Sequence, residues 1–175
     1  WKKPATFPNS QEEYARRFWA VARVGREDGV TLCHENVSYC RLALPEAVRE
    51  LRPLLGDKAA FVLDTKRAKR HGVPVEEMLD AMGSDLRHVH ISDYSANHNC
   101  IPPGQGNMDY QDFFARQQRI GHAGDIVLEL YRDGFATAEA LVEGVRYLNT
   151  LLPPGGAAAG VEWLYRHGGF AWKCP

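Results

Sequence analysis

AFVLDT, residues 60–65, is a short run of apolar residues that ends in an acidic side chain, Asp64. A continuous apolar run of this length is typical of a strand that is buried on both faces of a parallel sheet. Three further stretches repeat the pattern and hold Glu35, His90 and Glu129 at their ends: VTLCHEN at 30–36, HVHISD at 88–93 and DIVLELY at 125–131. We therefore predict four parallel strands.

The four strand ends are separated by intervals close to one βα unit. Glu35 and Asp64 are 29 residues apart, Asp64 and His90 are 26 apart, and His90 and Glu129 are 39 apart. A strand, a crossover helix and the next strand take roughly 30 residues. Because the carboxyl ends of parallel strands meet at one rim, the three carboxylates and the imidazole should converge there as a divalent-metal site. Taken singly, each would also fit a helix cap or a solvated loop charge.

Helix signals alternate with the predicted strands. Ser10 followed by Glu13 is a capping-box pattern, which predicts a helix from there to about Val24. Apolar residues at helical spacing predict further helices over 45–55, 74–82, 109–120 and 138–152. Pro53 is expected to strain or shorten the helix that contains it.

Several motifs together resemble the xylose-isomerase-like superfamily of sugar isomerases and epimerases. They are ENV at 35–37, DTK at 64–66, HVHISD followed by NCIPPGQGNMDY at 99–110, and LELY at 128–131. The resemblance spans about residues 28–152. It implies the α/β fold of a parallel (β/α)8 TIM barrel, represented here by about four C-terminal βα units, a half-barrel. It also implies that Glu35, Asp64, His90 and Glu129 bind one divalent metal ion.

Two positions depart from the family's pattern. Many members have a His three residues after the metal-binding Asp, where this chain has Arg67. The related apurinic-endonuclease branch has an Asp-x-His pair before the Gly-rich turn, where this chain reads His98-Asn99-Cys100. A single metal ion is therefore favoured over a multi-zinc cluster.

The length of the chain limits the resemblance. A complete barrel needs about 250 residues, whereas this chain has 175 and its first convincing strand starts at Val30. We expect a half-barrel domain over 1–152 and a Gly/Ala/Pro linker with an aromatic tail over 153–175. Such an open sheet would expose an apolar inner face with Leu32, Val62 and Val127, to be covered by a second copy, a partner, a missing N-terminal half or the tail.

Composition excludes some classes of partner. With 21 Lys and Arg against 22 Asp and Glu, the net charge is −1, so the chain lacks the basic surface that nucleic-acid binding requires. No apolar run reaches the roughly 18 residues of a membrane span. The four cysteines form no C-x-x-C pair. These features favour a cytoplasmic protein that acts on a small polar molecule, a sugar or sugar phosphate.

The ligand set indicates the chemistry. Carboxylate oxygens with one imidazole suit Mn²⁺, Mg²⁺ or Co²⁺, and Zn²⁺ is also possible. A metal chelated by a carbonyl and the adjacent hydroxyl acidifies the C–H between them and stabilises an enediolate. Glu35 and Glu129 are then the predicted proton acceptor and donor.

Two cations follow Asp64 directly. Successive side chains of an extended segment point to opposite faces, so only one of the two should enter the site. Lys66 shares the parity of Asp64 and is predicted to neutralise an oxyanion or bind an acidic substituent. Arg67 is a further predicted substrate contact. The alternative is that both are solvated loop charges.

The loop after His90 supplies the remaining predicted contacts. In CIPPGQG, residues 100–106, two prolines precede Gly104 and Gly106, whose amides could approach substrate oxygens closely. Cys100 lies in the same loop. Loop geometry alone explains the Pro-Pro-Gly sequence equally well.

Three functions are compatible with these residues. The leading hypothesis is a metal-dependent sugar isomerase or epimerase. The alternatives are a metal-dependent lyase or apurinic-endonuclease-like hydrolase on the same scaffold, and a half-barrel without catalytic activity.

Overall fold

A computed structural model describes residues 10–152 of the chain. In these residues, four strands form one parallel sheet in the order β1-β2-β3-β4, so consecutive strands are neighbours as in successive βα units. The strands are β1 (His34–Glu35), β2 (Phe61–Asp64), β3 (Leu86–Ile91) and β4 (Asp125–Leu128). The helices are α1 (Gln11–Glu27), α2 (Pro45–Leu55), α3 (Thr65–Arg70), α4 (Val75–Met82), α5 (Tyr110–Arg119) and α6 (Ala138–Leu151), with short 3-10 helices at Gly56–Lys58, Gly83–Asp85 and Arg132–Gly134.

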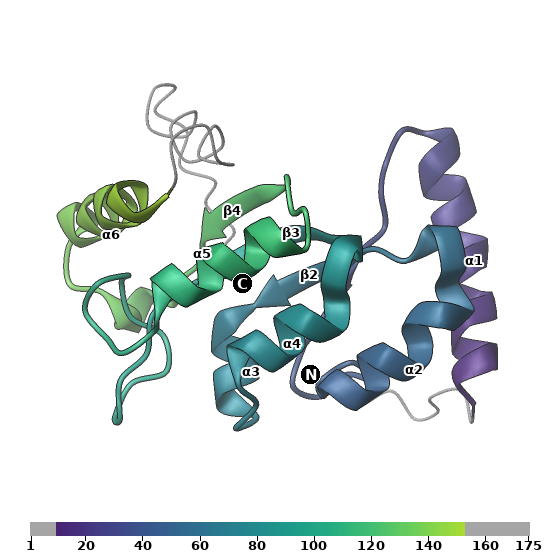
Figure 1. Cartoon of the computed structure of the whole chain (residues 1–175), viewed down its shortest axis with the longest axis horizontal. Helices are drawn as coiled ribbons and strands as arrows, with labels where there is room; N and C mark the ends of the chain where they lie inside the picture. Colours follow the sequence, from purple (N-terminus) through teal and green to yellow (C-terminus); the bar gives the residue numbers. More distant parts are fainter. Residues whose placement is uncertain (1–9, 153–175) are drawn as a thin grey trace.

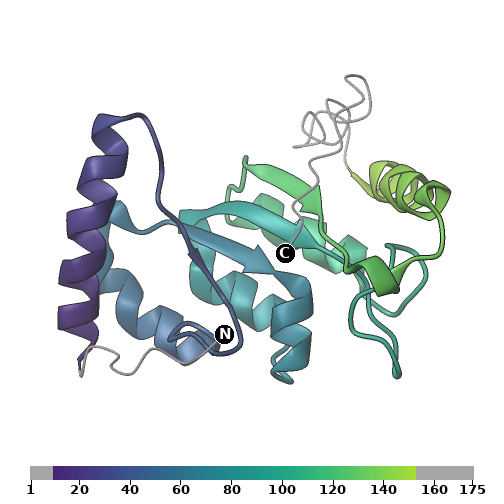
Figure 2. The same cartoon turned by 180° about the vertical axis from the view of Figure 1, so that it is seen from behind.

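Helices cover one face of the sheet only. Helices α2, α4 and α5 form a layer against the strands, and α1 packs on α2 at one end (Figure 1). Seen from behind, the strands lie in front of this layer, and no described helix covers them (Figure 2). The expected open sheet with helices on its outer face is confirmed. None of the helices in the described part of the chain is long and apolar enough to cross a membrane.

Along each strand, successive side chains point alternately to the two faces of the sheet. Phe61, Leu63, Val89 and Ile91 are fully buried against the helical layer. From the helices, this core is completed by Val48, Leu51, Met78, Leu79, Phe113 and Phe114. The apolar faces of the predicted helices therefore form the core together with every second side chain of the strands.

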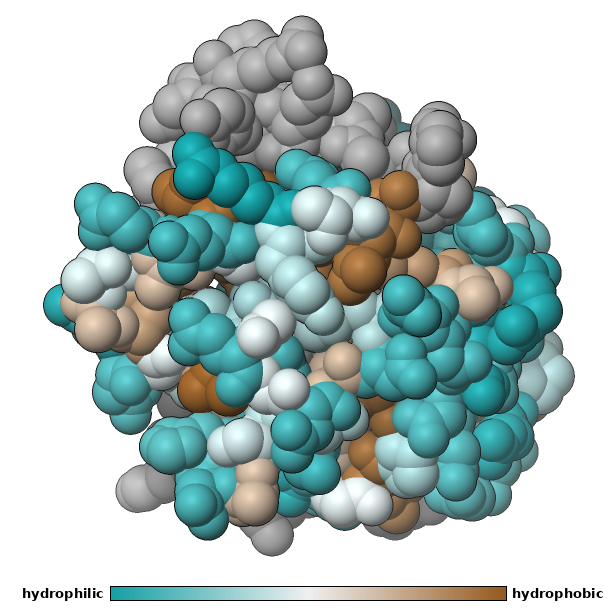
Figure 3. Space-filling view, turned by 60° about the vertical axis from the view of Figure 1, so that its left-hand side comes forward, coloured by the Kyte–Doolittle hydropathy of each residue, from teal (hydrophilic) through white to brown (hydrophobic). Residues whose placement is uncertain are grey.

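The uncovered face is more polar than we expected. Val62 is paired in register with Glu35 and His88, and His90 is paired with Val127. Val62 and Val127 are only partly buried, as predicted, but they share their face with carboxylates and imidazoles. From the α6 side, hydrophobic side chains reach the surface in several separate places among hydrophilic ones (Figure 3).

Several element boundaries differ from those predicted. β1 was expected from Val30, but only His34 and Glu35 pair with β2, and the N–H of Val30 instead bonds to the carbonyl of Gly25. β3 covers Leu86–Ile91, so it begins and ends two residues before the predicted stretch at 88–93. Pro53 does not shorten α2, which runs to Leu55 with Pro53 exposed in its last turn. The tail predicted over 153–175 lies outside the described residues.

A buried carboxylate fixes the long loop between β3 and α5. Asp93 is 1% exposed and accepts four backbone N–H groups. Tyr94 and Met108 donate to Oδ1 at 2.8 and 3.0 Å, and Gly104 and Gly106 donate to Oδ2 at 3.0 Å each. At Gly106, a Cβ would overlap the carbonyl of Tyr94 and the Asp93 carboxylate, so only glycine allows this approach.

His34, which neighbours Glu35 on β1, is a structural residue of the core. Its ring stacks on Phe18 with centroids 3.8 Å apart, and Nδ1 lies 3.1 Å from the Tyr14 hydroxyl. Nε2 is buried without a hydrogen-bond partner in the described residues. Burial lowers the pKa of His34 to about 4.

We expect Asp93→Asn to destabilise the protein by about 2–4 kcal/mol, because an amide NH₂ would face two backbone donors in place of a carboxylate oxygen. Urea unfolding measures the change, with the exposed Asp133→Asn as the matched control. Equal stability of the two variants would contradict the role given to Asp93.

The free energy of unfolding should fall as the pH drops from 6.5 towards 4, because His34 takes up a proton more readily when unfolded than in the core. The contribution of His34 is complete above pH 6.5 and amounts to about 3 kcal/mol at most. Urea unfolding at several pH values measures it. In His34→Phe, which can keep the stack on Phe18, this part of the pH dependence should disappear; the same pH dependence in both proteins would refute it.

Candidate metal centre

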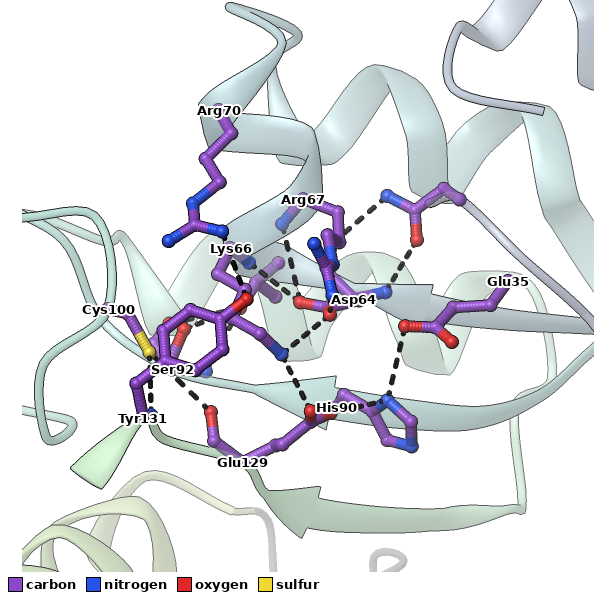
Figure 4. A network of polar contacts seen from close by, with 12 residues as sticks. Glu35, Asp64, Lys66, Arg67, Arg70, His90, Ser92, Cys100, Glu129 and Tyr131 are labelled. Carbon is purple, nitrogen blue, oxygen red and sulfur yellow. Dashed lines mark hydrogen bonds and ion pairs between the residues drawn. The ribbon is translucent and has the colours of Figure 1, made fainter. Parts of the chain in front are cut away.

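The four predicted metal ligands meet at one rim of the sheet. Glu35, Asp64 and His90 lie on β1, β2 and β3, and Glu129 follows the last residue of β4. Each offers one ligand atom, and the four atoms lie within 4.8 Å of one another (Figure 4). The predicted convergence of these side chains is therefore present in the structure.

At the rim of the sheet, side chains form hydrogen bonds to the backbone of the neighbouring strand and so fix the positions of the ligands. Asn36 is fully buried; its Nδ2 donates to the carbonyl of Asp64 at 3.0 Å and its Oδ1 accepts the N–H of Asp64 at 2.7 Å. Thr65 Oγ1 donates to the carbonyl of Ser92 at 3.1 Å and accepts its N–H at 2.9 Å. Sequence reasoning gave no role to Asn36, Thr65 or Ser92, although they lie within the ENV, DTK and HVHISD motifs.

His90 stands between two carboxylates. Its Nδ1 lies 2.7 Å from Glu129 Oε2 and 3.6 Å from Glu35 Oε1. Burial opposes a charge on the ring, but the contacts with Glu129 and Glu35 outweigh burial and raise the pKa of His90 to about 9. The same contact with His90, helped by Lys66, lowers the pKa of Glu129 to about 2.

Lys66 enters the site, but from a helix and not from an extended segment. Its Nζ lies 2.6 Å from Asp64 Oδ2 and 3.0 Å from Glu129 Oε1, and its side chain is 1% exposed. Burial opposes the ammonium charge, and the two carboxylates outweigh it, so that the pKa of Lys66 is raised. In this structure Lys66 therefore binds the ligand carboxylates; a contact with a substrate oxyanion stays a prediction.

The residues after Asp64 form α3, which the sequence analysis did not predict. Asp64 Oδ1 caps this helix by accepting the N–H groups of Lys66 and Arg67 at 3.0 and 3.3 Å. Because successive residues of a helix turn by about 100° rather than 180°, Lys66 and Arg67 both reach the same carboxylate. Arg67 Nε lies 3.5 Å from Asp64 Oδ2, with 20% of the side chain exposed. The expectation that only one of the two cations enters the site was wrong.

The predicted contacts from the loop are engaged within the protein. Gly104 and Gly106 donate their N–H groups to Asp93, so these amides are not directed at a ligand in this structure. Cys100 Sγ accepts the N–H of Tyr131 at 3.4 Å, and burial raises the pKa of its thiol. Contact of these three residues with substrate stays a prediction without support from their geometry.

His88 precedes His90 by two residues on β3 and lies beside the cluster. Its ring is perpendicular to that of His90, with centroids 5.1 Å apart. Burial lowers the pKa of His88, which favours the neutral ring. The residue is half-buried, so it is not an enclosed core histidine.

The chemistry of the cluster fits a divalent metal ion. His90 Nδ1 and Glu129 Oε2 are buried and lack a well-oriented hydrogen-bond partner in the described residues. Both residues belong to the cluster whose ligand atoms lie within 4.8 Å of one another, and a cation held there would satisfy these two atoms. Three carboxylates and one imidazole suit Mn²⁺, Mg²⁺ or Co²⁺, with Zn²⁺ also compatible.

Solved structures with this fold include sugar epimerases. The 3-keto-D-glucoside 4-epimerase of E. coli matches with a TM-score of 0.66 and 18% identity, over 85% of this chain and 58% of that chain. The D-psicose 3-epimerase of Clostridium cellulolyticum H10, solved with D-tagatose, matches with a TM-score of 0.63 and 18% identity, over 86% and 61%. The chain thus spans about three fifths of the length of these enzymes.

A probable 3-DHS dehydratase of Bacillus anthracis also matches, with a TM-score of 0.62 and 12% identity, over 81% of this chain and 56% of that chain. No curated protein sequence matches this chain. The family model described as xylose isomerase-like TIM barrel matches residues 2–167. Since this match covers most of the sequence, the chain belongs to the xylose isomerase-like TIM barrel family.

Proposed function

We propose that this chain carries the metal centre of a divalent-metal-dependent sugar isomerase or epimerase. The observation that carries the proposal is the meeting of Glu35, Asp64, His90 and Glu129, whose ligand atoms lie within 4.8 Å of one another. The epimerases among the similar structures support a sugar as the substrate.

The four ligands divide into two kinds by their exposure. Asp64 is 1% exposed and is held by Lys66, so it can bind an ion but cannot reach a substrate. Glu35 and Glu129 keep 32% and 41% of their side chains exposed and flank the same nitrogen of His90. They are the two carboxylates that a bound sugar can touch from either side.

A metal ion held by these four residues would polarise a carbonyl oxygen of the sugar and acidify the neighbouring C–H. Glu35 and Glu129 would then remove a proton from that carbon and return one, through an enediolate. Lys66 holds Glu129 and Asp64 in place and offsets their negative charge.

A metal-dependent lyase is the second candidate, and the structural similarity to the probable 3-DHS dehydratase favours it. The same carboxylate pair would remove a proton and deliver one to a leaving hydroxyl. The products of the reaction separate the two candidates.

We expect the protein to bind one Mn²⁺ per chain. Asn36→Ala should weaken binding by about 10- to 100-fold, because Asn36 positions Asp64, and His90→Ala should weaken it further. Electron paramagnetic resonance of free Mn²⁺ measures the affinity, with the exposed His98→Ala as the control. Absence of binding by the parent protein, or an equal loss in His98→Ala, would contradict the metal site.

Glu129→Gln should keep the fold and lower turnover and solvent deuterium incorporation into a ketose by about 10²- to 10⁴-fold, as loss of a general acid–base group does. D-psicose serves as the neutral ketose and D-ribulose 5-phosphate as the anionic one. Mass spectrometry of the recovered sugar follows the exchange. Glu139→Gln, on the exposed surface of α6, is the matched control. Unchanged exchange in Glu129→Gln would remove Glu129 from the proton transfer.

A further inference from the structure

We propose that the substrate carries an anionic group, a phosphate or a carboxylate, which Arg67, Arg70 and Tyr131 bind on the α3 side of the metal centre. The inference rests on the proposed function, because it names the class of sugar derivative that the same site accepts. It is drawn from three features of the network in Figure 4: the placement of the two arginines, their unused donors and the balance of charge.

Helix α3 places both arginines beside the cluster. Arg67 and Arg70 are three residues apart, so they share one face of the helix. Arg70 Nη1 donates to Tyr131 Oη at 2.9 Å, and its guanidinium carbon lies 4.7 Å from the centroid of the same ring. Tyr131 follows Glu129 by two residues, and its ring centroid lies 5.5 Å from Lys66 Nζ. The contacts therefore form a continuous path from Arg70 to the metal ligands.

These side chains offer donors that the described residues do not use. Tyr131 Oη accepts a hydrogen bond from Arg70, so the hydroxyl proton remains available for a ligand. Arg67 Nε has no hydrogen-bond partner in the described part of the chain and lies 3.5 Å from Asp64 Oδ2, while 20% of the Arg67 side chain is exposed and can be reached by a ligand. A planar guanidinium matches the paired oxygens of a carboxylate or phosphate.

The charge of the network also favours an anion. Lys66 pairs with Asp64 and Glu129, and Arg67 lies 3.5 Å from Asp64 Oδ2. Arg70 has no carboxylate partner in the described residues; its contacts are with the hydroxyl and the ring of Tyr131. A phosphate or carboxylate on the substrate would supply the anionic partner that Arg70 lacks.

Lys69 supplies a matched control on the same helix. Its ammonium lies 4.3 Å from the centroid of the Tyr94 ring, away from the Arg70–Tyr131 pair, and its side chain is exposed. Lys69→Gln removes the same charge as Arg70→Gln without removing a donor of the proposed site. A comparison of the two variants separates a specific contact from general attraction.

The test compares anionic sugars with neutral ones. Isothermal titration calorimetry measures the binding of each probe to the full chain, both without metal and with Mn²⁺. D-ribulose 5-phosphate is compared with D-ribulose, and D-fructuronate is compared with D-fructose. We expect at least one anionic probe to bind about tenfold or more tightly than its neutral partner. The pair that shows the preference identifies phosphate or carboxylate.

Arg67→Gln and Arg70→Gln should abolish this preference, Tyr131→Phe should reduce it, and Lys69→Gln should keep it. Mn²⁺ binding by Arg70→Gln should match that of the parent protein, because Arg70 is not a ligand. Equal affinity of the parent for anionic and neutral probes, or the same loss in Lys69→Gln as in Arg70→Gln, overturns the anion site. Failure of the parent to bind Mn²⁺ overturns the proposed function instead, while the measurements without metal still decide the anion site.

Discussion

The burial of the Asp64 carboxylate determines the arrangement of the residues around it. A carboxylate that is 1% exposed is stable only when hydrogen bonds and opposite charges replace its hydration. Two backbone N–H groups of α3 and the Lys66 ammonium provide this compensation, and Asn36 fixes the backbone from the neighbouring strand. The Asp64 carboxylate therefore determines where α3 starts, how Lys66 is directed and how β1 joins β2.

Because Lys66 and the backbone of α3 offset the charge of the buried Asp64, the remaining ligands can stay partly exposed. Glu35, His90 and Glu129 lie above Asp64 and Lys66 and keep a quarter or more of their side chains accessible. In the protein alone, the proton on His90 and the Lys66 ammonium balance the two glutamates, which is why the pKa of His90 rises and that of Glu129 falls. The cluster therefore has a rigid buried part that holds position and an accessible part that can exchange protons.

Sequence reasoning identified the strand ends and the four ligands because their chemistry recurs at βα-unit spacing. It missed α3 because TKRAKR has no apolar stripe, and the N-cap that starts this helix is Asp64, whose acid had already been interpreted as a ligand. The amides of Gly104 and Gly106 were predicted to approach substrate oxygens, but in the structure they donate to Asp93 of the same chain. No local pattern in the sequence reveals which carboxylate folds back onto a loop.

Closure of the sheet and access to the site depend on the same surface. Glu35 and His90 are paired in register with Val62 and Val127, and Glu129 follows Val127 by two residues. No described helix covers this face of the sheet (Figure 2). Any segment or partner that buries these valines must pass next to the glutamates and would exclude water from the metal centre. On the side of the ligand cluster that faces α3, the described residues Lys66, Arg67 and Tyr131 already surround the site. In the proposed anion site, selectivity for a charged group of the substrate would therefore arise from residues of this chain, whereas selectivity for the rest of the substrate would depend on what covers the open face.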